Sequence, residues 1–216
     1  MARRTTRCQS RERFRSWHTG YGTGVASIPA PPVPLSQVGR AAHDVGLAGL
    51  LGGNLFGRLA LHPSVTEISD KTERGKLVNA AWHRYGIINS LSLGAVVAGW
   101  LGARGKEAAP NQLSEAERRL AVAKDVLVGV VAVTGAVTAA EGVRFSRQAP
   151  GGAVPLDDGD HTAAEASEAQ HRAKARLNAL GLASLAADLA LVGVNAALAQ
   201  EGFRRPPRRR IRRWRD

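Results

Sequence analysis

The sequence predicts an all-α protein, a four-helix transmembrane bundle with disordered basic N- and C-terminal tails. Three observations predict it. One segment repeats glycine at helical spacing, several apolar runs carry no charge, and the basic residues lie mainly outside these runs. The mean hydropathy of −0.17 is low for a membrane protein because the charged residues lie at the two ends and in the loops. Of 30 Lys and Arg residues, seven lie in 3–40 and eight in 204–215.

The first expected helix, about 36–61, contains the segment HDVGLAGLLGGNLFGRLAL, which begins at His43. Small residues recur at spacings of three and four, so they share one helical face. Such a face allows close helix packing in lipid, whereas in water each interior glycine costs about 1 kcal/mol relative to alanine. The helix should end before Pro63, because the residue preceding a proline is disfavoured in helical geometry. The packing residues are Gly46, Gly49, Gly53 and Gly57, in a span of about 38–61.

Ser64–Glu67 has capping-box spacing and predicts a short helical turn. A similar cap at 70–73 precedes the second expected helix, which covers about 72–103. The stretch 87–103 carries no charge. Trp82 and Tyr85 precede it and Trp100 lies near its end, as in an aromatic belt. The expected membrane span is about 84–103.

Capping-box spacing at Ser114–Glu117 opens a third helix, about 115–143. Its run VLVGVVAVTGAVTAA has no polar face, which a surface helix of a soluble bundle would show. Thr162–Glu165 has the same capping spacing and predicts a fourth helix that ends near Gln200. The expected spans of the third and fourth helices are about 122–143 and 177–199. The uncharged runs within these helices are shorter than the roughly 20 residues of a typical span, so the spans must include polar residues.

Three regions follow from this pattern: a disordered basic arm (1–35), the four-helix membrane domain (36–200) and a basic cytoplasmic tail (201–216). With four spans, both termini and the 104–119 connection share one side of the membrane. That side holds 19 Lys and Arg, and the other side holds nine. This excess predicts a multi-pass protein of the cell membrane with both termini in the cytoplasm.

Polar residues inside the spans are the candidate sites. Asp188 lies with Asn178, Ser184 and Asn195 on one face of the fourth helix, where intramembrane polar groups should face the bundle interior. Asp188 is either a proton- or cation-binding carboxylate or, by the preferred interpretation, a structural acid hydrogen-bonded between helices. Arg58 and Glu141 are expected to form an ion pair.

No motif points to an enzyme, a cofactor or a metal site. The sequence contains no Gly-x-Ser-x-Gly elbow, phosphate-binding loop or His-Glu-x-x-His motif, and Cys8 is a lone thiol. We therefore expect no catalytic residues.

The basic tail is expected to bind anionic lipid headgroups at the cytoplasmic face, a more economical interpretation than nucleic-acid binding. Its headgroup-binding residues are Arg204, Arg205, Arg208, Arg209, Arg210, Arg212 and Arg213. A remaining glycine face allows a homo-oligomer.

The segment HDVGLAGLLGGNLFGRLAL and the span pattern between Ser36 and Gln200 resemble small uncharacterised four-span membrane proteins of actinobacteria. This resemblance implies no activity. Three functions remain open: a structural or accessory membrane bundle, which we favour, a small transporter or channel component that uses Asp188, and a soluble helical protein that binds nucleic acid through its tails.

Overall fold

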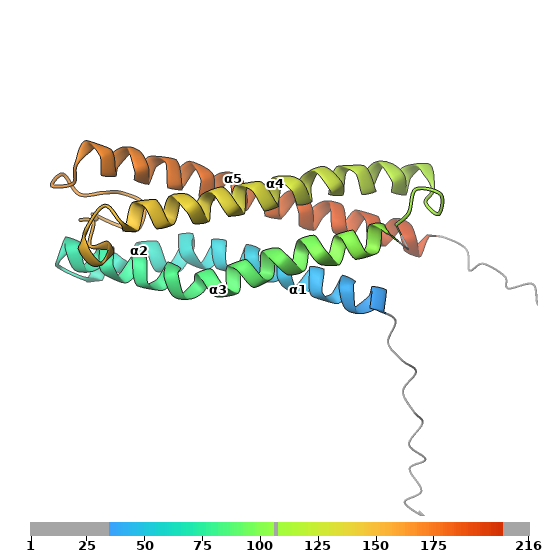
Figure 1. Ribbon diagram of the computed structural model, residues 1–216, viewed down its shortest axis with the longest axis horizontal. Helices are drawn as coiled ribbons and strands as arrows, with labels where there is room; N and C mark the ends of the chain where they lie inside the picture. Colours follow the sequence, from blue (N-terminus) through green and yellow to red (C-terminus); the bar gives the residue numbers. More distant parts are fainter. Residues whose placement is uncertain (1–34, 106–107, 205–216) are drawn as a thin grey trace, which may run out of the picture. The chain divides into compact units, whose positions relative to one another are not determined.

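The computed structural model describes residues 35–105 and 108–204, and this part of the chain is helical without a β-strand (Figure 1). Its one isolated bridge joins Leu156 to Thr162. Of the two tails that are expected to be disordered, the structure describes only Leu35 and residues 201–204. Leu35 belongs to α1, and residues 201–203 belong to the last helix, so these residues are helical.

The first helical segment continues further than the sequence predicts. Helix α1 (Leu35–Phe56) passes into a π-helical turn, η1 (Gly57–Leu61), and a short helix, α2 (His62–Ser64). His62 keeps helical dihedrals (φ −62°, ψ −43°), so the expected end before Pro63 is wrong. The wider π-turn shifts the hydrogen-bond register immediately before Pro63, where the missing N–H of proline would otherwise leave a gap.

The next two helices begin at the caps that the sequence indicates. In α3 (Lys71–Arg104) the Asp70 carboxylate accepts hydrogen bonds from the first-turn amides, and in α4 (Glu115–Ser146) Ser114 and Glu117 form the predicted capping box. Ser64 forms no such cap, and the 3₁₀ turn η2 (Val65–Glu67) follows it.

The cap of the last helix is corrected by the structure. Helix α5 (Glu168–Phe203) starts at a capping box formed by Ser167 and Gln170, not at Thr162. Thr162 instead pairs with Leu156 in the bridge, and its hydroxyl contacts His171. The connection between α4 and α5 is therefore longer, and it includes the 3₁₀ turn η3 (Pro150–Gly152), where Gly151 and Gly152 adopt positive φ.

The helices pack as two antiparallel pairs, α1 with α3 and α4 with α5, and these pairs have the most extensive contacts. Contacts of α1 with α5 and of α3 with α4 are fewer and join the pairs into an antiparallel four-helix bundle. We call the end with the connections 65–70 and 147–167 the two-loop end, and the opposite end, with the connection 105–114, the one-loop end.

The glycine face of α1 lies against α3. A Cβ atom added at Gly46 would lie 2.6 Å from the Ser92 carbonyl oxygen, and one at Gly53 would overlap the ring of Tyr85. One at Gly57 would overlap Trp82. The small residues therefore permit the close approach of the two helices, and the Tyr85 hydroxyl donates a hydrogen bond to the Gly49 carbonyl.

Three of the helices, α3, α4 and α5, are long and apolar enough to cross a membrane. Helix α1 is not among them, since glycines and polar residues such as Arg40, His43 and Asp44 replace apolar side chains along it.

Candidate functional site

A line of polar side chains runs between α1 and α5. Near the two-loop end, polar residues recur every four positions along α1, η1 and α2, at Asn54, Arg58 and His62. This spacing keeps them on one helical face, which meets the polar face of α5. We call this set, with Lys124 of α4 and Asp160 of the last connection, the polar column: Asp44, Asn54, Arg58, His62, Lys124, Asp160, Asn178, Ser184, Asp188 and Asn195.

Asp188 lies in the middle of the polar column and is almost completely buried, with 2% of its surface exposed. The Asn54 side-chain amide donates a hydrogen bond to Asp188 Oδ2 at 2.8 Å. The hydroxyl of Ser184, one turn earlier on α5, is also buried and has no hydrogen-bond partner in the described part of the chain. A carboxylate can accept about four hydrogen bonds, so this group retains capacity for a proton, a water or a small cation.

At the one-loop end the polar column links three helices. The buried Lys124 ammonium donates to the side-chain oxygen of Asn195, and the Asn195 amide donates to Asp44 Oδ1 at 3.0 Å. The ammonium also lies 4.3 Å from the centre of the Trp100 ring, within cation–π range. Lys124 therefore has a hydrogen bond and an aromatic face as partners in place of a direct carboxylate contact.

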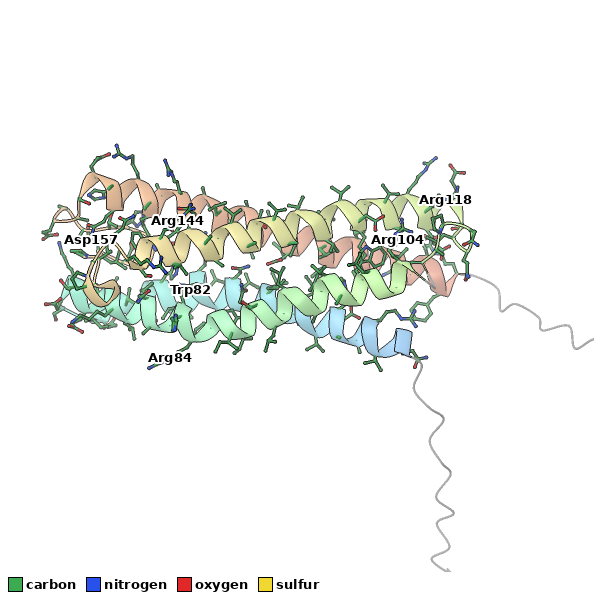
Figure 2. All side chains as sticks on the ribbon, viewed as in Figure 1. Trp82, Arg84, Arg104, Arg118, Arg144 and Asp157 are labelled. Carbon is green, nitrogen blue, oxygen red and sulfur yellow. The ribbon has the colours of Figure 1, made fainter. Side chains whose placement is uncertain are left out.

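Asp125 belongs to a separate ion pair at the same end. It accepts hydrogen bonds from Arg104, at 2.7 Å, and from the Trp100 indole, at 2.8 Å. Figure 2 shows Arg104 near the end of α3 that leads to α4. This pair, which joins α3 to α4, is not predicted from the sequence.

At the two-loop end the polar column meets the last connection. Arg58 donates to the Asn178 carbonyl at 2.9 Å and lies 3.9 Å from Asp160 Oδ1. His62 Nδ1 lies 2.9 Å from the same carboxylate oxygen, while the Trp82 indole donates to His62 Nε2 at 3.3 Å. Because Nε2 accepts from Trp82, we assign the proton of neutral His62 to Nδ1, where it donates to Asp160.

Lys174 is buried beside this group, with 6% of its surface exposed, and its ammonium lies 6.0 Å from the Phe145 ring centre. Lys174 precedes the expected span 177–199. Burial lowers its pKa to about 8, although Asp160 and Asp158 oppose the shift. Burial also lowers the pKa of His62, with a further contribution from the Lys174 charge.

The last connection is fastened to the other helix pair by backbone hydrogen bonds. The amide of Leu156 donates to the Lys71 carbonyl, and the amide of Gly159 donates to the His62 carbonyl, both at 3.0 Å. Val154 and Leu156 are buried with Val65 and Val78 in a second apolar cluster. Asp160 is therefore held in place by a fixed loop.

The candidate residues predicted from the sequence differ in their surroundings. Asp188, Asn178, Ser184 and Asn195 all lie in the polar column, and three of these four have a described polar partner. The predicted pairing of Arg58 with Glu141 is absent among the described ion pairs, because Arg58 faces Asp160 and Glu141 binds Arg144 at 2.5 Å.

Of the predicted headgroup-binding arginines, the structure describes only Arg204. It pairs with Glu201 at 2.8 Å. The others, from Arg205 to Arg213, lie outside the described residues.

The sequence does not reveal that His62, Asp160 and Lys174 lie together at the two-loop end. A signal for His62 exists, since Asn54, Arg58 and His62 recur every four residues. Asp160 and Lys174 give no such signal, because their burial depends on the path of the last connection.

No family model, curated protein or solved structure matches this chain. Within the described residues, no group of three or more His, Cys, Asp or Glu side chains is arranged to hold a metal ion.

Proposed function

We propose that the chain is an integral membrane protein with four spans, a structural or accessory helical bundle whose termini both lie in the cytoplasm. The observation that carries this proposal is the distribution of polarity across the helices. Large apolar side chains are exposed along the outer faces, while Asp188, Lys124 and Asn195 lie in the polar column between them. This arrangement suits a lipid surround, in which the outer face is apolar and intramembrane polar groups face the bundle interior.

The outer face of α1 and η1 supports a fourth span, although α1 is less apolar than the other three helices. Val45 is 72% exposed, and Phe56 and Leu59 are 63% and 75% exposed. Ile87 and Leu91 on α3 and Val133 on α4 are similarly exposed, at 70%, 71% and 64%. Large apolar side chains are exposed on α1, α3, α4 and also on α5, at Leu182 and Leu189, so all four helices are proposed to contact lipid.

The orientation rests on the asymmetry of Lys and Arg, 19 against nine, between the two sides. It places the one-loop end at the cytoplasmic face and the two-loop end at the outer face.

A sequential wash of isolated membranes tests the proposal. High salt removes proteins held by charge alone, and alkaline carbonate removes peripheral proteins. We expect the full chain to remain in the membrane through both washes. Release by high salt would contradict integral insertion and would favour a soluble helical protein that binds anionic surfaces or nucleic acid through its basic tails.

The polar column favours a second candidate function, the passage of protons or small cations. The observation behind it is the incomplete hydrogen bonding at Asp188 and Ser184. If Asp188 carries a proton or cation, Asp188→Asn should abolish flux into proteoliposomes and leave assembly unchanged. Asp157→Asn is the matched control, since Asp157 is a half-exposed acid outside the polar column. Absence of flux through the unmodified protein would reject this candidate and leave the structural role.

A further inference from the structure

A continuous groove lies between the C-terminal half of α4 and the N-terminal half of α5, on a surface that the polar column does not use. The part nearer the two-loop end, which we call the upper part, has a volume of about 390 Å³ and is lined by three arginines, Arg144, Arg172 and Arg176. Its lower part, about 430 Å³, is lined mainly by apolar side chains, Val137, Ala179 and Leu180. Arg176 and Glu141 line both parts, so the two depressions are continuous.

The change from basic to apolar lining coincides with the expected boundary of the hydrocarbon. Val137 lies within the span 122–143, and Ala179 and Leu180 lie within the span 177–199. Arg144 directly follows the first of these spans, Arg176 directly precedes the second, and Arg172 lies about one helical turn before Arg176. A phospholipid has the same division, with a charged phosphate at the interface and acyl chains below it.

The charges in the upper part are unbalanced. Arg144 pairs with Glu141 at 2.5 Å, and Arg172 pairs with Glu168 at 3.6 Å. Arg176 is exposed and has no ion pair among the described residues. The three arginines and two glutamates leave one positive charge, which matches the net negative charge of an anionic phospholipid, whereas a zwitterionic lipid has no net charge. Arginine is also well suited to bind phosphate oxygens.

We propose that this groove binds one anionic phospholipid of the outer leaflet, with its phosphate on Arg176 between Arg144 and Arg172 and an acyl chain along Val137 and Leu180. This inference rests on the proposed membrane function. It differs from the predicted binding of headgroups by the C-terminal tail, because the groove lies at the opposite end of the bundle and contacts both parts of the lipid.

Native mass spectrometry of the detergent-purified full chain tests the site. We compare retention of phosphatidylglycerol, which is anionic, with that of phosphatidylcholine, which is zwitterionic. The unmodified protein should retain one phosphatidylglycerol molecule in preference to phosphatidylcholine. Arg176→Gln should weaken that retention about fivefold, the effect expected from one basic residue at a lipid surface.

Arg84→Gln is the matched control. Arg84 is an exposed arginine on α3 that points away from α4 and α5 in Figure 2, and its removal should leave retention unchanged. Equal retention of the two lipids by the unmodified protein, or equal loss in both variants, would overturn the site.

Carbonate extraction of the same variants separates this inference from the proposed function. Proteins that stay in the membrane but lack selectivity for phosphatidylglycerol would refute the groove alone. Release of the unmodified chain by carbonate would refute membrane insertion and the groove with it.

Discussion

Histidines at the two-loop end illustrate how individual residues respond to their surroundings. His62 is buried between Trp82 and Asp160, and burial lowers its pKa. His161 is exposed and contacts Asp158 at 2.9 Å, and this hydrogen bond raises its pKa. The same residue type therefore acts on stability in opposite directions, because one imidazole is desolvated and the other gains an anionic partner.

We expect His62 to make folding less stable in acid. Its pKa in the folded state lies below the unfolded value of 6.5, so its favourable contribution is complete above pH 6.5 and is lost as the pH falls below that value. His62→Gln keeps a polar side chain without a titrating charge. The thermal unfolding midpoint of this variant, measured in detergent, should fall less between pH 7 and pH 5 than that of the unmodified protein.

His161→Gln provides a control of opposite sign. The raised pKa of His161 gives a stabilising contribution that is present below pH 6.5 and is lost as the pH rises through the folded pKa. The deficit of His161→Gln should therefore be larger at pH 5 than at pH 8. Equal pH profiles for the two variants would mean that neither environment acts as described.

At the scale of elements, the contact of α1 with α3 depends on which glycines face the neighbouring helix. Gly46 is buried, and an added Cβ would crowd the Ser92 carbonyl at 2.6 Å and the Ala95 methyl at 3.0 Å. Gly52 is exposed, and an added Cβ there meets no atom within 4 Å. Sequence spacing alone assigns both residues to the same helix, while packing gives them different roles.

Gly46→Ala should destabilise the bundle by about 1–3 kcal/mol, because the Ser92 carbonyl belongs to the backbone and α3 would have to move as a whole. Gly52→Ala should be neutral or stabilise the helix by up to about 1 kcal/mol. Thermal unfolding of the two variants in detergent measures the difference. A loss of stability in Gly52→Ala of the size expected for Gly46→Ala would contradict this helix contact.

For the whole molecule, the prediction concerns orientation. Asn111 in the 105–114 connection and Ala164 in the last connection are both exposed and lie at opposite ends of the bundle. With Cys8 replaced by serine, a cysteine introduced at position 164 should react in intact cells with a maleimide that cannot cross membranes. A cysteine introduced at position 111 should react only after permeabilisation.

The control for this experiment is the Cys8→Ser protein, which has no other cysteine and should not be labelled. Labelling of both positions in intact cells would contradict a four-span topology with cytoplasmic termini. Labelling of position 111 alone would reverse the orientation and place the phospholipid groove in the cytoplasmic leaflet.

The helical class, the starts of α3 and α4 and the small-residue face of α1 can all be predicted from the order of residues. These features are local, since a capping box and a 3.6-residue period need only neighbouring residues. The start of α5 was predicted five residues too early, because Thr162–Glu165 and Ser167–Gln170 offer similar caps and only the bridge to Leu156 distinguishes them.

The partners of the polar residues, in contrast, depend on how the helices and the last connection pack together. Arg58 meets Asp160 in place of the expected Glu141, and Lys174 is buried although it precedes the expected span 177–199. Both outcomes follow from the last connection, which is held to the Lys71 and His62 carbonyls by backbone hydrogen bonds. Helical periodicity specifies the face on which a side chain lies, but the position of a loop between two helix pairs depends on contacts between residues distant in the sequence.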